Sequence, residues 1–349
     1  MRRDIVPKIA AVPHWETGQM AFGMGRRELI AGLGSASLAL PHAARAQKPA
    51  MSVVGFLGVV SGPEAIPDLL AAFRRGLAEA DFVEGKNLVV EYRFANFRPE
   101  LMLEGAGDLS RRNVNVIFAG IPEAVAAARD ATTSIPIVGV DLESDPLAKG
   151  YVKSFARPGG NMTGMFLDFP ELTGKQVGLL KDIVPGLFRL AVIGMPNLNA
   201  AQFAAAEIAA RTLGLEPQML EVRVLDDFEQ ALESAKKKHV EAGILLSSPL
   251  VWVSSKQIAE QALAKQLPFV FMFDIFPKSG GLISYGPNVA DIYRRCGEYV
   301  AKVLHGAKPS DLPIQRPERF DLVINLKTAA ALGLDMPTQI QQLADEVIE

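Results

Sequence analysis

Residues that carry nucleophilic or metal chemistry are scarce in this chain. Its 349 residues include one cysteine, Cys296, and four histidines. One cysteine rules out an internal disulfide, and no cysteine or histidine has the spacing of a zinc site. The sequence also lacks a Gly-x-Ser-x-Gly nucleophile motif and a Walker-type phosphate loop. We therefore expect no enzyme activity, no catalytic residues, no metal site and no cofactor.

Strong charge of one sign and long apolar runs are lacking as well. The formal net charge is -3, and the sequence contains no concentrated basic run. Because nucleic-acid binding requires a concentrated basic surface, this charge argues against a nucleic-acid partner. No stretch in the body of the chain stays apolar over the roughly 20 residues that span a bilayer. Length and hydrophobic content instead favour a globular chain with more than one core.

The N-terminal region has the three parts of an export signal. Arg26 and Arg27 form a basic start, residues 29–40 are apolar, and small residues precede a cut after Ala46. The paired arginines resemble the twin-arginine type of signal. We predict a signal peptide at about 24–46 and a protein of the bacterial periplasm.

Two details refine this prediction. Met24 lies one glycine before the basic pair, so we expect residues 1–23 to be an upstream misread start and residues 1–46 to lie outside the folded protein. No cysteine follows the apolar segment, which excludes a lipid anchor on an N-terminal cysteine. The sequence does not distinguish the twin-arginine route from general export.

The few candidate catalytic side chains have structural explanations. His14 and His42 lie in the segment that we expect to be removed. His239 and His305 follow basic helix ends, where cations are favoured, and we predict surface positions for both. Cys296 lies inside a helical stretch and is predicted to be a small buried hydrophobe.

The most informative pattern is a duplication. Short apolar runs alternate twice with helical stretches, which is typical of βαβ units and a parallel sheet covered on both faces. We predict two similar doubly wound lobes with a cleft between them, because ligands sit beyond the carboxyl ends of such strands. A proline near the start of the last strand recurs in both copies. The corresponding elements are 53–57, 66–80, 88–92, 100–112, 114–119, 122–132 and 135–138 in the first copy, and 190–193, 200–213, 217–222, 227–238, 242–246, 254–266 and 267–271 in the second.

Small and polar residues follow the strands of both copies and form the predicted ligand site. Backbone N–H groups at helix starts can bind a carboxylate, and an aspartate can pair with an ammonium group. The same residue types also populate turns and helix caps without any ligand, so this alternative stays open for each residue. The predicted residues are Ser61, Gly62, Gly120, Ile121 and Asp141 in the first copy, and Asn197, Ser248, Phe273 and Asp274 in the second.

Several segments together resemble the substrate-binding proteins of ABC transporters, in the group that includes tryptophan and tyrosine binders. The resemblance covers residues 51–349 and the export segment. The matching segments are AAFRRGL at 71–77, EGKNL at 84–88, EYR at 91–93, RPGGNMTG at 157–164, GGLISYGP at 280–287, KPSDLP at 308–313 and FDLVINLKTA at 320–329.

The resemblance implies a type I periplasmic-binding fold, in which two doubly wound parallel-sheet lobes are joined by three crossing segments. Residues 157–164 would form the first crossing and 279–287 the second, with a helix at 291–304 returning to the first lobe. Tyr285, on a crossing segment, joins the predicted ligand site. The expected lobes are 51–158 with about 285–318, and 165–280 with about 319–349.

The family also implies the function and the partners. We expect a monomer that closes over a small aromatic or carboxylate-bearing molecule and presents it to an inner-membrane permease with its ATPase. A ligand-sensing module of a receptor or regulator is the alternative, and an exported α/β enzyme is less favoured. One departure concerns the ligand: family members usually have a longer Gly-Gly-Thr-Pro-like loop where this chain has Gly120-Ile121-Pro122.

Overall fold

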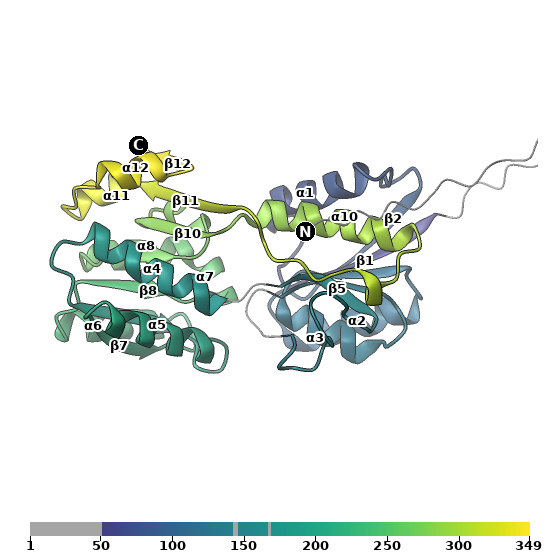
Figure 1. The fold of residues 1–349 in the computed structure, drawn as a ribbon, viewed down its shortest axis with the longest axis horizontal. Coiled ribbons are helices and arrows are strands. Elements are labelled where there is room, and N and C mark those ends of the chain that lie inside the picture. Colours follow the sequence, from purple (N-terminus) through teal and green to yellow (C-terminus); the bar gives the residue numbers. More distant parts are fainter. Residues whose placement is uncertain (1–50, 142–145, 167–168) are drawn as a thin grey trace, which may run out of the picture. The chain divides into compact units, whose positions relative to one another are not determined.

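The computed structural model describes residues 51–141, 146–166 and 169–349. The predicted export signal lies outside the described residues. Two α/β lobes are built around two separate sheets (Figure 1). Within the described residues, no helix is long and apolar enough to cross a membrane.

The first lobe contains a parallel sheet of five strands in the order β2-β1-β3-β4-β5. Helices follow the first three strands in the chain. The elements are β1 (Ser52–Gly58), α1 (Pro67–Ala78), β2 (Leu88–Phe94), α2 (Pro99–Arg111), β3 (Val116–Ala119), α3 (Pro122–Ala131), β4 (Ile137–Asp141) and β5 (Met162–Phe166).

The second lobe contains seven strands in the order β12-β11-β10-β9-β8-β6-β7, of which only β10 and β11 pair antiparallel. The elements before the chain leaves this lobe are α4 (Phe169–Ile183), β6 (Arg189–Gly194), α5 (Ala200–Thr212), β7 (Glu216–Glu221), α6 (Asp227–Lys237), β8 (Ala242–Leu245), α7 (Pro249–Val253), α8 (Ser255–Ala264), β9 (Phe269–Phe271), α9 (Ile275–Lys278) and β10 (Ile283–Pro287). The chain later returns with β11 (Phe320–Asn325), α11 (Leu326–Ala331), α12 (Thr338–Leu343) and β12 (Glu346–Ile348).

The predicted duplication is confirmed by the topology. The orders β2-β1-β3-β4 and β7-β6-β8-β9 arrange corresponding strands in the same way. The recurring proline has the same role in both lobes. The Pro136 carbonyl accepts a hydrogen bond from Ile117 N–H at 2.8 Å, and the Pro268 carbonyl accepts one from Gly243 N–H at 2.9 Å. A proline suits the start of these strands because its missing N–H is not needed there.

Side chains alternate across the first sheet and are buried on both faces. Phe56 packs edge-on against Phe73 of α1, with ring centroids 5.6 Å apart. The next residue, Leu57, belongs instead to the apolar cluster of α2 and α3, together with Leu109 and Val125. Burial on both faces explains why the strand sequences are continuously apolar.

Helix α10 (Val289–Leu304) brings the chain back to the first lobe, where it packs against α1 (Figure 1). Two glycines allow their backbones to approach. A Cβ at Gly76 would lie 1.8 Å from the Arg294 carbonyl oxygen, and a Cβ at Gly297 would lie 2.3 Å from the Phe73 carbonyl oxygen. The predicted return of a helix to the first lobe is therefore confirmed, and glycine is required on both sides of the contact.

The structure corrects the position of the first predicted crossing. The predicted crossing 157–164 runs into a strand of the first sheet. Residues 162–166 form β5, which pairs with β4. Gly164 has a φ of 142°, and a Cβ there would lie 2.0 Å from the Gly139 carbonyl oxygen. This glycine therefore permits close strand pairing, and the chain leaves the first sheet only after Phe166.

The second predicted crossing, 279–287, is corrected in the same way. Its last residues form β10, which pairs with β9 and β11 in the second sheet. A Cβ at Gly286 would lie 2.0 Å from the Met272 carbonyl oxygen, so this glycine also serves packing. The chain leaves at Asn288, whose N–H donates to the Arg319 carbonyl at 3.0 Å. The first lobe therefore extends to Phe166, and the second lobe extends to Pro287 before the chain leaves it.

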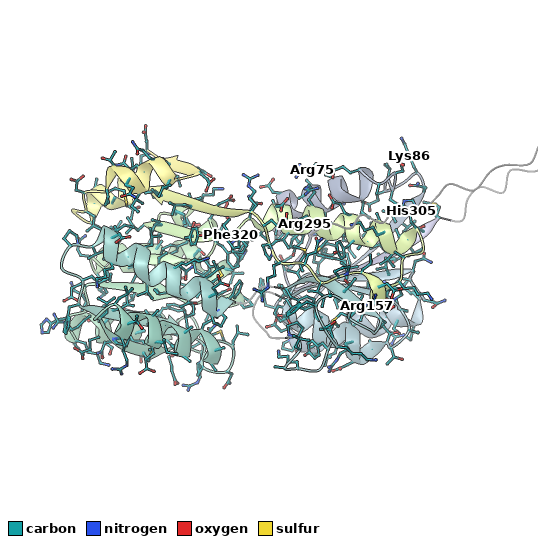
Figure 2. The ribbon with its side chains drawn as sticks, viewed as in Figure 1. Arg75, Lys86, Arg157, Arg295, His305 and Phe320 are labelled. Carbon is teal, nitrogen blue, oxygen red and sulfur yellow. The ribbon has the colours of Figure 1, made fainter. Side chains whose placement is uncertain are left out.

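The third passage runs from the end of the 3-10 turn at Pro309–Asp311 to β11 and is held by α10. Arg295 (Figure 2) is buried, and its guanidinium donates to the Gln315 side chain at 2.6 Å, the Arg316 carbonyl at 3.3 Å and the Glu318 carboxylate at 2.9 Å. Tyr299, one helical turn further on, donates its hydroxyl to the Pro313 carbonyl at 2.7 Å. One helix thus fixes the start of this passage to the first lobe.

We predict that Gly76→Ala lowers the free energy of unfolding by about 1–3 kcal/mol, because α1 and α10 must separate to admit the new methyl group. The control is Gly178→Ala in the middle of α4, where a Cβ meets no atom within 4 Å. This control should raise stability by about 0.5–1 kcal/mol through helix propensity. Urea unfolding measures both, and a Gly76→Ala variant as stable as the parent would contradict the packing argument.

The anchoring of the third passage gives a second prediction. Arg295→Met should lower the free energy of unfolding by about 1–3 kcal/mol, because partly enclosed acceptors lose a charged donor. Glu318→Gln should change it by less than about 1 kcal/mol, since the Glu318 side chain is 79% exposed. Equal losses for the two variants in urea unfolding would show that the ion pair, rather than the buried network, carries the stability.

Candidate functional site

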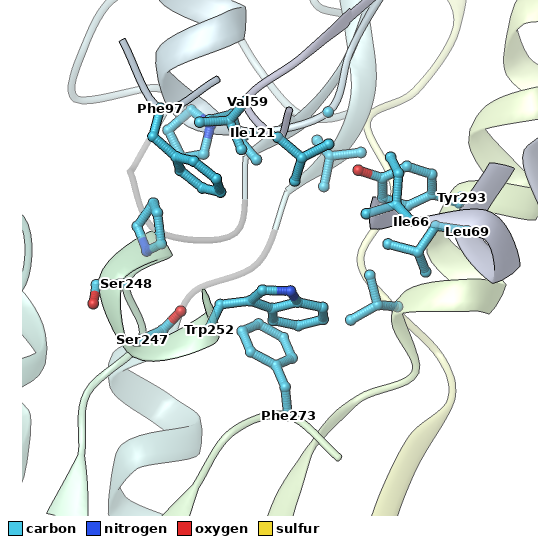
Figure 3. Close-up of a pocket in the computed structure, with 16 residues that line it drawn as sticks. Val59, Ile66, Leu69, Phe97, Ile121, Ser247, Ser248, Trp252, Phe273 and Tyr293 are labelled. Atoms are coloured by element: carbon cyan, nitrogen blue, oxygen red, sulfur yellow. The ribbon is translucent and has the colours of Figure 1, made fainter. Parts of the chain in front are cut away.

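A small cavity lies at the carboxyl ends of the strands and is lined from both lobes (Figure 3). Its volume is about 120 Å³. The lining is mainly apolar and aromatic, and none of its described residues carries a charge. The lining residues are Val59, Val60, Ile66, Leu69, Phe97, Gly120, Ile121, Pro122, Val140, Ser247, Ser248, Pro249, Trp252, Phe273, Val289 and Tyr293.

The second lobe contributes an aromatic wall. Trp252 of α7 and Phe273, which follows β9, meet edge to face with ring centroids 5.1 Å apart. Phe169 and Phe271 support Phe273 from behind, at 6.2 and 5.5 Å. Figure 3 shows the Trp252 and Phe273 rings side by side on one side of the cavity. Such a wall is rigid and suits a flat apolar ligand.

The strand β8 and the start of α7 supply the polar groups on that side. Ser248 is the N-cap of α7, and its hydroxyl oxygen accepts a hydrogen bond from Val251 N–H at 3.2 Å. Pro249 at the first helical position suits this helix start. Because the Ser248 oxygen acts as acceptor towards the helix, its O–H proton stays available to donate.

Helix α10 supplies Tyr293 from the first-lobe side. The residue is only 7% exposed, and its ring packs edge-on against Phe118 at 5.3 Å. Its hydroxyl lies against Gly120, where a Cβ would approach it to 2.7 Å. Burial raises the pKa of this hydroxyl, so it is neutral and keeps its proton. No hydrogen bond holds the hydroxyl among the described residues.

The loop from β3 to α3 forms the part of the first-lobe wall next to Tyr293. Ile121 and Pro122 line the cavity, and Glu123 follows at the second position of α3. The pKa of Glu123 is raised because the surrounding protein reduces its solvation and the Asp141 carboxylate repels its charge, although the side chain still contacts solvent. Its own backbone N–H and Lys149 act to lower the pKa of Glu123.

Four of the predicted ligand residues line the cavity. Gly120 and Ile121 lie on the first-lobe side, and Ser248 and Phe273 on the second-lobe side. Gly120, Ile121 and Ser248 follow the corresponding strands β3 and β8, and Phe273 follows β9. Their contact with a ligand stays a prediction.

Three of the predicted residues lie outside the cavity lining. They are Ser61 and Gly62 of the first copy and Tyr285 of the predicted second crossing. Ser61 and Gly62 follow β1, but the preceding residues Val59 and Val60 are the ones that line the cavity. Tyr285 lies within β10, where its ring stacks on Phe320 at 6.3 Å and its carbonyl accepts from Gln176. Tyr285 therefore packs within the second lobe, between β10, β11 and α4.

The three remaining predicted residues are also outside the lining. Asp141 is fully buried at the end of β4, one residue beyond Val140. Asn197 is exposed in the turn after β6. Asp274 pairs with Lys278 at 2.6 Å, so its carboxylate already has a cationic partner. Glu143, Ser144 and Asp145, which come shortly after Asp141 in the sequence, lie outside the described residues.

The sequence argument missed the residues that shape the cavity most. Trp252, Tyr293 and Phe97 were not predicted. Trp252 is one of two tryptophans in the chain and follows the polar strand end Ser247-Ser248-Pro249, which is a signal that could have found it. Tyr293 carries no such signal, because it reaches the cavity through the packing of a helix far away in sequence.

The candidate catalytic side chains occupy structural positions. Cys296 is fully buried, and burial raises the pKa of its thiol, which confirms the prediction of a small buried hydrophobe. His239 and His305 are exposed at the ends of α6 and α10, also as predicted. Across the described residues, no group of three or more histidine, cysteine, aspartate or glutamate side chains could hold a metal ion.

Comparison with known proteins shows similarity to binding proteins. A tyrosine-binding protein of Clostridioides difficile is 23% identical over 264 residues, covering 75% of each chain. The structure of an ABC domain in complex with L-Trp from Streptococcus pneumoniae has a TM-score of 0.78 at 21% identity and covers 86% of this chain and 100% of that chain.

Further structures show the same fold. A conserved domain protein from Vibrio cholerae has a TM-score of 0.76 at 24% identity and covers 85% of this chain and 99% of that chain. The predicted type I periplasmic-binding fold is confirmed by these similarities and by the two parallel-sheet lobes. Residues 54–348 match the family described as ABC transporter substrate binding protein. This chain therefore belongs to the family of ABC transporter substrate-binding proteins.

Proposed function

We propose that this protein is the periplasmic binding component of an ABC uptake system and takes up a small aromatic compound in the cavity between its lobes. The observation that carries this proposal is the aromatic wall of Trp252 and Phe273 opposite the apolar first-lobe wall. Ligand sites of this kind are mostly apolar, with a few polar groups that orient the ligand. Tyr293 and Ser248 are such groups here.

Binding is proposed to proceed by closure of the two lobes. Each lobe supplies part of the cavity lining, so full contact with a ligand requires both. If the closed state were about 1% populated without ligand, closure would reduce the affinity about a hundredfold, or about 2.7 kcal/mol. Contacts from both walls must offset this cost. Among the described residues, the passages at Asn288 and between Asp311 and Phe320 are the segments that would bend.

The chemistry of the site supports binding without catalysis. The described lining offers hydroxyl groups but no histidine, cysteine, lysine or carboxylate that could act as base or nucleophile. The members of this family serve membrane permeases with their ATPases, and we propose such a permease as the partner. We further propose that the protein is exported, carries its signal peptide at about 24–46, and works as a monomer.

The aromatic wall gives a testable prediction. Trp252→Ala should weaken binding of the tightest compound from a panel of phenol, p-cresol, indole, tryptamine, L-tyrosine and L-tryptophan by about tenfold or more, because a ring-on-ring contact is lost. A thermal-shift screen identifies the binder, since a ligand of the folded state raises the melting temperature. Isothermal titration calorimetry then measures the affinity.

Phe188→Ala is the matched control for this experiment. Phe188 is an aromatic residue of the same lobe, 52% exposed and outside the cavity lining, so its loss should leave the affinity unchanged. Equal affinity of the parent and Trp252→Ala would place the ligand elsewhere. Failure of every aromatic compound to bind would overturn the proposed ligand class.

A further inference from the structure

We infer that the cavity takes a single-ring aromatic compound that has a hydroxyl or amine group but no carboxylate. This inference rests on the proposed function of the same cavity and narrows the class of its ligand. It follows from the size of the cavity, from an unpartnered buried hydroxyl, and from the charges on the first-lobe side.

The first argument is size. The cavity measures about 120 Å³, close to the roughly 150 Å³ of a cavity known to hold one benzene molecule. Trp252 and Phe273 form one wall, and the side chains of Ile66, Leu69 and Ile121 face them in Figure 3. A single ring matches this volume.

The second argument is the Tyr293 hydroxyl. It is carried by a residue that is more than nine-tenths buried, and no described residue forms a hydrogen bond with it. Figure 3 shows it on the side of the ring that faces Ile121. The hydroxyl therefore faces the cavity with no hydrogen bond from a described residue, and a ligand hydroxyl or amine can form one with it. The Ser248 O–H proton offers a second hydrogen bond from the opposite wall.

The third argument is charge. The described lining has no cationic side chain to pair with a carboxylate. A carboxylate moved from water into this apolar space would lose its hydration without a compensating ion pair. A neutral phenol or an alkyl-substituted ring carries no such penalty.

The acidic residues near the start of α3 also disfavour a ligand that carries a carboxylate. The first N–H groups of a helix usually attract an anion, but here Glu123 in the first turn of α3 already brings a carboxylate next to them. Asp141, at the end of the neighbouring strand β4, is close enough to repel the Glu123 charge. Both residues directly follow lining residues, Pro122 and Val140. The exposed Lys149 acts on Glu123 in the opposite direction.

Four compounds with the same ring test the inference by isothermal titration calorimetry on the intact protein. p-Cresol is neutral, tyramine adds an amine, 3-(4-hydroxyphenyl)propionate adds a carboxylate, and L-tyrosine carries both groups. We expect p-cresol to bind at least tenfold more tightly than the propionate, and tyramine more tightly than L-tyrosine, because each pair differs by the carboxylate.

The outcomes distinguish an error in the ligand class inferred here from an error in the proposed binding function. If the propionate or L-tyrosine binds as tightly as p-cresol and tyramine, this inference is overturned while the aromatic function stands. If none of the four compounds and no other aromatic compound binds, the proposed function itself fails.

One pair of variants tests whether Glu123 disfavours a ligand that carries a carboxylate. Glu123→Gln should raise the affinity for the propionate by about threefold or more and leave p-cresol unchanged, because one repelling charge is removed. Glu100→Gln is the matched control: Glu100 also follows a proline at the start of a helix, α2, but is outside the cavity lining. An equal response of both variants would assign the effect to overall charge and contradict the role of Glu123.

Tyr293→Phe tests the hydroxyl. It should weaken p-cresol binding about fivefold or more and leave toluene binding unchanged, since only p-cresol can form the lost hydrogen bond. The variant should fold normally, because it removes a buried polar group that has no partner. Equal losses for both compounds would show that Tyr293 only shapes the wall.

Discussion

The close backbone contact between α1 and α10 is the constraint on which the rest of this structure depends. Gly76 and Gly297 let the two helices approach until each meets the other's backbone. This contact draws the chain back from the second lobe to the first, and the chain must then cross once more to complete the second sheet with β11 and β12. Three connections between two lobes follow from one helix pair.

The same helix links the framework to the ligand site. Tyr293 reaches the cavity, Arg295 holds the third passage, and Gly297 packs on α1. Tyr293 and Gly297 are four residues apart and lie on one face of the helix, whereas Arg295 points in another direction, so one helix serves all three contacts. A change in the packing of α10 on α1 would therefore affect both the cavity wall and the third passage, although the contact between the two helices lies outside the cavity lining.

The first-lobe wall and the second-lobe wall differ in chemistry although the two copies share a topology. The second lobe presents the Trp252 and Phe273 rings, while the first presents aliphatic side chains with Phe97, Tyr293 and Gly120, and two carboxylates lie next to its lining residues. The shared framework sets where strand ends meet, and the residues placed there differ. This separation of framework from site explains how members of one family accept different ligands.

Strand and helix positions in both copies were predictable because burial on two faces imposes continuous apolar runs, and surface helices impose mixed ones. The prediction also found Gly120, Ile121, Ser248 and Phe273 at the cavity, since they directly follow strands. It misplaced two connections, 157–164 and 279–287, which the family resemblance implied as crossings. Gly164 and Gly286 in fact admit a neighbouring backbone.

The sequence by itself thus determined the duplicated βαβ framework, the location of a ligand site at the strand ends, and the scarcity of catalytic groups. Only the tertiary structure decided which side chains enter the site. Tyr293 comes from a helix that is about 170 residues from Gly120 in the chain, yet its hydroxyl lies against that glycine. Local patterns report burial and turns, whereas a cavity depends on the packing of distant segments, which no local pattern encodes.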